Sequence, residues 1–86
     1  MITKLFSIKD EKAGFGPVFE TMNEGLAVRQ FGQDCSRPAP DGRINMLIEC
    51  PKDYSLYVVG EWDNEKAQLI PMEPKQIATA SQYVQK

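Results

Sequence analysis

Histidine is absent from this chain of 86 residues. Its absence removes the commonest general base at neutral pH, the commonest metal ligand, and every Ser-His or Cys-His nucleophile pair. The Walker and GxGxxG phosphate-binding patterns are absent as well. We therefore expect no enzymatic activity, no cofactor and no metal.

Cysteine is scarce, and the chain has no long apolar run. Cys35 and Cys50 are fifteen positions apart, so they form no CxxC motif, and no second pair completes a zinc site. The spacing does not exclude a disulfide, but without a signal peptide we favour reduced thiols in a cytoplasm. The apolar stretches are too short to cross a bilayer, so we expect no membrane partner.

Positive charge is not in excess. Ten Lys and Arg against twelve Asp and Glu give a net charge of −2. A dedicated DNA-binding protein usually shows a basic stripe, because neutralised phosphates release counterions. This sequence shows none, which leaves a basic patch formed on folding as the alternative. The acidic residues Glu61, Asp63 and Glu65 lack the spacing of a calcium loop and indicate a hairpin turn.

The length of the chain leaves room for one hydrophobic core. We expect a single domain over residues 1–86, with ordinary globular proportions of 42% hydrophobic and 26% charged residues. Domains of this size often depend on a partner or on self-association, so a homo-oligomer is one expected state.

Alternating apolar residues predict two strands. In residues 2–8, Phe6 and Ile8 share one face. In residues 54–62, Leu56 and Val58 share a face, and Tyr57 lies on the other.

Turn residues predict how these strands are connected. A polar turn over 63–66 and an apolar return over 67–70 predict a hairpin, closed by Pro71 and Pro74. Residues 10–16 predict a loop, followed by a short extended piece at 18–19. Residues 77–84 predict a last short strand.

One principal helix is expected to begin near Asn23, a good capping residue, or two residues earlier at Thr21. Its core-facing positions follow helical spacing: Ala27, Val28, Phe31 and Cys35. Residues 36–42 predict a loop. Residues 44–50 fit a helical turn or a short strand, and we favour the turn.

These elements together predict the α+β class, with a small, mostly antiparallel sheet and one principal helix packed on a face. The predicted core consists of Phe6, Ile8, Val28, Phe31, Leu56 and Val58.

Three stretches carry a family resemblance. They are SIKD with KAGF and PVF over residues 7–19, NEGLAVRQF over 23–31, and PKDYSLYVVGEWD over 51–63. In this order they resemble the small nonstructural protein of gokushovirus-type microviruses (Microviridae), the tiny single-stranded DNA phages. The similarity covers about residues 2–70.

The resemblance implies a non-virion protein in the cytoplasm of the infected host bacterium. It implies a role in single-stranded DNA genome synthesis or packaging, and proteins of this kind are often described as DNA-binding. It brings no catalytic residues. The implied partners are single-stranded DNA or phage and host replication proteins. The alternative is a protein-interaction module that modulates a replication protein without touching DNA.

Four residues are the candidate contacts for DNA or a partner: Lys9, Lys12, Arg29 and Tyr57. The two lysines flank a loop whose glycines would let a backbone approach closely. Arg29 offers a planar fork to phosphate, and Tyr57 offers a ring for base stacking. The plainer alternatives are a solvated arginine, glycines that serve a turn, and an aromatic that suits a strand. The neighbouring acidic residues 10 and 11 counter much of the loop's charge.

Overall fold

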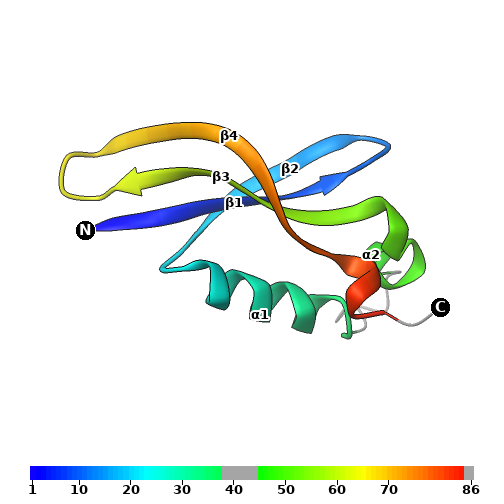
Figure 1. Ribbon diagram of the computed structural model, residues 1–86. Coiled ribbons are helices and arrows are strands. Elements are labelled where there is room, and N and C mark those ends of the chain that lie inside the picture. The colour runs from blue at the N-terminus through cyan, green and yellow to red at the C-terminus, as the bar shows by residue number, and fades with distance from the viewer. Residues whose placement is uncertain (38–44, 85–86) are drawn as a thin grey trace.

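The computed structural model describes residues 1–37 and 45–84. Four antiparallel strands form one sheet in the order β2-β1-β3-β4, and one principal helix lies along one side of it (Figure 1). This arrangement confirms the predicted α+β fold. Within the described residues, no helix is long and apolar enough to cross a membrane.

The sheet is built from two hairpins joined through its central strands. β1 (Ile2–Asp10) pairs with β2 (Gly14–Thr21) on one side and β3 (Tyr54–Asp63) on the other. β3 turns back into β4 (Gln68–Thr79), which is an edge strand. The tip of the β3–β4 hairpin and the N-terminus extend past the end of the helix, so that part of the sheet has no helix beneath it (Figure 1).

The loop predicted over 10–16 is shorter in the structure. β1 runs to Asp10 and β2 already begins at Gly14, so three residues make the turn. Gly14 has φ 96°, a conformation that residues with a Cβ rarely adopt. The Asp10 carboxylate accepts a hydrogen bond from the backbone N–H of Lys12 at 2.9 Å, which closes the turn. The extended piece predicted at 18–19 is part of a full eight-residue strand.

Pro71 and Pro74 do not end the second hairpin arm, and this prediction was wrong. β4 continues through both prolines to Thr79 because it lies at the edge of the sheet, where a missing N–H donor is tolerated. Pro74 falls within an irregularity between the pairs Val58–Lys75 and Gly60–Pro71. The separate strand predicted over 77–84 is wrong for the same reason. Its first residues finish β4, and the short 3-10 helix η2 (Ala80–Gln82) follows.

The principal helix α1 (Glu24–Asp34) begins where the capping residue predicted it. The Asn23 side chain accepts a hydrogen bond from the backbone N–H of Leu26 at 3.0 Å. A one-turn helix α2 (Met46–Glu49) confirms the helical turn expected within 44–50, and the 3-10 helix η1 (Pro51–Asp53) leads into β3. Most of the loop predicted over 36–42 lies outside the described residues.

The hydrophobic core lies between α1 and one face of the sheet. Four of the six predicted core residues are fully buried, namely Phe6, Phe31, Leu56 and Val58. Ile8 and Val28 are only partly buried and pack against this core. Further small side chains complete it: Ala27, Cys35, Ala78 and Ala80. Among the elements that the structure describes, no helix covers the opposite face of the sheet.

Candidate nucleic-acid interface

The uncovered face of the sheet carries Tyr57, as the period-two pattern predicted. Leu56 and Val58 on either side of it are buried under α1, so the tyrosine ring projects the other way. Its phenol O–H donates a hydrogen bond to the side-chain oxygen of Gln76 on β4 at 3.2 Å. This bond links the tyrosine ring to the neighbouring strand.

Phe15 and Lys9 join Tyr57 in one cluster, which we call the aromatic platform. The rings of Phe15 and Tyr57 meet edge to face, with centroids 5.2 Å apart and planes at 80°. The Lys9 Nζ lies 5.6 Å from the Phe15 centroid and 5.8 Å from the Tyr57 centroid. Both distances are within the range of a cation–π interaction. Three adjacent strands thus bring two aromatic rings and one cation together.

Small residues make room for the platform. Ser7 pairs with Tyr57 across β1 and β3, and it is fully buried beneath larger neighbours. Its hydroxyl donates to the Gly16 carbonyl at 2.9 Å, so the buried polar atom is satisfied. Phe15 remains 47% exposed. The platform therefore presents aromatic surface to solvent on a hydrogen-bonded base.

The local acidic residues divide between the two faces. Asp10 pairs with Tyr54 in the sheet and accepts a hydrogen bond from the Tyr54 hydroxyl at 3.3 Å. Burial and the nearby Asp10 carboxylate raise the pKa of Tyr54. Glu11 lies closer to the platform, with an oxygen 3.9 Å from the Lys9 Nζ. Both side chains are partly exposed, so solvent weakens this ion pair.

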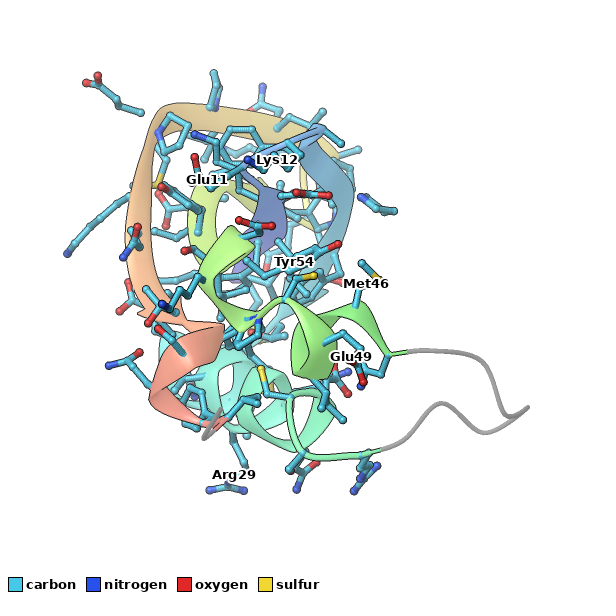
Figure 2. The ribbon with its side chains drawn as sticks, turned by 90° about the vertical axis from the view of Figure 1, so that its right-hand side faces the viewer. Glu11, Lys12, Arg29, Met46, Glu49 and Tyr54 are labelled. Atoms are coloured by element: carbon cyan, nitrogen blue, oxygen red, sulfur yellow. The ribbon has the colours of Figure 1, made fainter. Side chains whose placement is uncertain are left out.

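The structure does not bring all four predicted contact residues together. Lys9 and Tyr57 share the platform, and Lys12 lies at the same end of the molecule in the β1–β2 turn. Arg29 lies far from them, on the outer side of α1 (Figure 2). Ala27 and Phe31 are the buried positions of that helix, and a residue midway between them points outward.

Phe15 is the platform residue that the sequence analysis missed. The sequence predicts a loop over residues 10–16, and a loop gives this ring no predicted partner. The signal that could have placed it is the glycine at position 14. A turn at that glycine starts β2 early and sets Phe15 opposite Lys9.

Two members of the acidic group over 61–65, Asp63 and Glu65, make contacts at the β3–β4 turn. The Asp63 carboxylate accepts hydrogen bonds from the backbone N–H groups of Glu65 at 3.0 Å and Lys66 at 3.3 Å. The Glu65 side chain pairs with the N-terminal amine at 3.0 Å. Within residues 1–37 and 45–84, no three His, Cys, Asp or Glu side chains gather as a metal site would require.

The two cysteines are free thiols. Cys35 is buried at the end of α1, and burial together with the adjacent Asp34 raises the pKa of its thiol to about 11. A thiol with so high a pKa is a poor nucleophile at neutral pH, so Cys35 acts as a core residue.

The family model described as Phage ORF5 protein matches residues 3–83, which is nearly the whole chain. No curated protein and no solved structure matches this chain.

Proposed function

The chain belongs to the Phage ORF5 protein family. We propose that it is a nonstructural phage accessory protein and that it binds single-stranded DNA through the aromatic platform. Its place of action is the cytoplasm of the host bacterium, and it acts there without catalysis. The step it serves is the synthesis or packaging of a single-stranded genome, as the resemblance to gokushovirus-type microviruses implies.

The observation that carries the proposal is the geometry of the platform. Proteins that bind single strands without base-specific contacts combine aromatic rings, on which bases stack, with cations that follow the backbone. Phe15 and Tyr57 supply exposed ring surface, and Lys9 supplies the cation beside both rings. The uncovered face leaves space for a base to reach them.

The same geometry favours single strands over duplex. A base can stack on an aromatic ring only when it is unpaired. Duplex binding usually relies on several phosphate contacts from a basic surface, and the charge of −2 gives no such surface overall. We expect stacking to supply most of the affinity, because Glu11 lies 3.9 Å from Lys9 and competes for its charge.

The test is a fluorescence anisotropy titration with labelled single-stranded and duplex DNA at two salt concentrations. Removing the ring by Tyr57→Ala should weaken single-strand binding about 5- to 150-fold, since one stacked base contributes roughly 1–3 kcal/mol. Tyr57→Phe keeps the ring and should bind almost as the wild type does. Lys9→Ala should flatten the dependence of log K on log salt by about 0.7, the effect of one phosphate contact on a single strand.

Arg29→Ala is the matched control, because it removes an exposed cation on the far side of α1. It should leave affinity and salt dependence unchanged. Circular dichroism should first show that each variant is folded. Equal losses from Lys9→Ala and Arg29→Ala would place the site elsewhere.

The alternative function is a protein-interaction module that modulates a replication protein without binding DNA. The net charge of −2, which gives no basic surface overall, favours it. The same titration separates the two functions. Absence of single-strand binding by the wild-type protein at low salt would refute the DNA proposal and leave this alternative.

A further inference from the structure

A second feature of the uncovered face lies beside the platform. It is a groove of about 550 Å³ that receives residues from all four strands. The groove is lined by Leu5, Val18, Val59, Gly60, Leu69, Ile70 and Pro71. None of these side chains is charged, and none belongs to the aromatic platform.

The sides of the groove are unusually exposed for apolar residues. Val18 on β2 is 59% exposed, and Leu69 on β4 is 69% exposed. They stand on the two edge strands, with the groove between them. Contiguous apolar surface of this kind on a small protein usually marks an interaction site.

We propose that this groove is the interface of a homodimer, in which a second copy of the chain packs the groove part of its uncovered face against the same part of the first and leaves the aromatic platform open. A two-fold axis makes such an interface self-complementary. The exposed side chains at the edge of one groove, Val18 and Leu69, then enter the groove of the partner copy. Two apolar faces are thereby removed from water at once.

The chemistry of the groove argues against other occupants. DNA and charged peptides need counter-charges, and the lining offers none. An extended peptide that adds as a strand needs a free row of N–H groups at the sheet edge. Pro17 on β2 and two prolines on β4, at positions 71 and 74, interrupt both edges. Packing of face on face needs neither charge nor edge donors.

The size of the face fits a weak dimer. Four strands spaced about 4.8 Å apart and about 30 Å long give a flat area of roughly 600 Å². The platform takes one part of it, so the groove contributes an area at the low end for specific interfaces, below about 600 Å² per partner. We therefore expect a reversible dimer with a dissociation constant on the order of micromolar.

Sedimentation equilibrium measures this association directly, over about 1 to 300 µM protein, a range chosen to bracket a micromolar dissociation constant. Leu69→Lys and Val18→Lys should each raise the dissociation constant at least about tenfold, because each would bury a charge in an apolar interface. Leu26→Lys is the matched control. Leu26 is 39% exposed on the outer side of α1, and the same substitution there should leave the constant unchanged.

Three results would overturn the inference. One is a wild-type protein that stays monomeric throughout the concentration range. Another is an equal effect of Leu26→Lys and Leu69→Lys, and the third is no effect of either groove variant. The substituted side chains are exposed in the monomer, so thermal melting should show all variants folded. The measurement contains no DNA, so a negative result leaves the proposed DNA function standing. A negative DNA titration likewise leaves the inferred dimer standing.

Discussion

Gly60 is the position where one added methyl group should disturb the sheet most. A Cβ built there would lie 2.8 Å from the carbonyl oxygen of Ile70 and 3.7 Å from the Cα of Pro71. Both atoms belong to the backbone of β4, so no side-chain rotation can relieve the clash. β3 and β4 approach this closely beside the irregularity opposite Val59. Gly60→Ala must therefore push the edge strand outward.

The magnitude follows from two opposing effects. Replacing glycine by alanine at an unstrained position stabilises a protein by about 0.4–1 kcal/mol, through the lower entropy of the unfolded chain. Overpacking costs typically about 1–3 kcal/mol. Because the clash is with backbone, we expect overpacking to win, with a net loss of about 1–2 kcal/mol. For a domain of this size, that lowers the melting temperature by roughly 4–16 °C.

Urea denaturation followed by circular dichroism measures the free energy of unfolding for such a series. At Gly60 the loss should grow with side-chain size, from Gly60→Ala to Gly60→Val. Gly14 is the control, because nothing lies within 4 Å of its Cβ position while its φ of 96° is unfavourable for alanine. There Gly14→Ala should cost about 1 kcal/mol from torsion alone, and Gly14→Asn should cost less. A Gly60→Ala protein as stable as the wild type would refute the close approach of β3 and β4.

Two further predictions concern the core. Phe31→Ala should lower the free energy of unfolding by about 3–5 kcal/mol, because Phe31 is 1% exposed. Phe15→Ala on the exposed platform should lower it by less than about 1 kcal/mol in the same urea titrations. Similar losses at the two positions would mean that α1 is not docked as described. The pKa of Cys35 is raised from its ordinary value of 9.0 to about 11, so the folded state holds this proton more tightly than the unfolded state. The resulting stability is fully present below pH 9 and is lost as the pH rises through 11. Between pH 8 and 11 the free energy of unfolding of the wild type should therefore fall by about 2 kcal/mol more than that of Cys35→Ala in urea titrations. Parallel losses would show that the thiol is not buried.

The local patterns were sufficient to predict most elements of the fold. Alternation placed β1 and β3, the polar turn placed the hairpin between β3 and β4, and Asn23 placed the start of α1. Each of these signals depends on residues close together in the chain. Whether the strand continues through Pro71 and Pro74 depends instead on where β4 lies in the sheet, since an edge strand accepts proline and a central strand does not. Edge position is a property of the assembled sheet, so local patterns could not supply it.

The candidate site, too, was predictable only where it depends on residues close together in the chain. Tyr57 could be assigned to the uncovered face because its neighbours alternate with it. Its proximity to Lys9 depends on the register between β1 and β3, and its contact with Phe15 depends on the turn at Gly14. Arg29 could not be excluded from the sequence, because helical spacing shows which side of α1 is buried but not which face of the sheet it covers.

The negative charge of the chain must be reconciled with a DNA-binding platform, and the positions of the charges allow this. Asp63 and Glu65 lie at the tip of the β3–β4 hairpin. From Tyr57 to Asp63 the strand extends about 20 Å, at roughly 3.3 Å per residue. At physiological salt, exposed charges are largely screened beyond about 8 Å. The hairpin carboxylates therefore add little to the potential at the platform, which depends on nearer charges such as Lys9, Lys12 and Glu11.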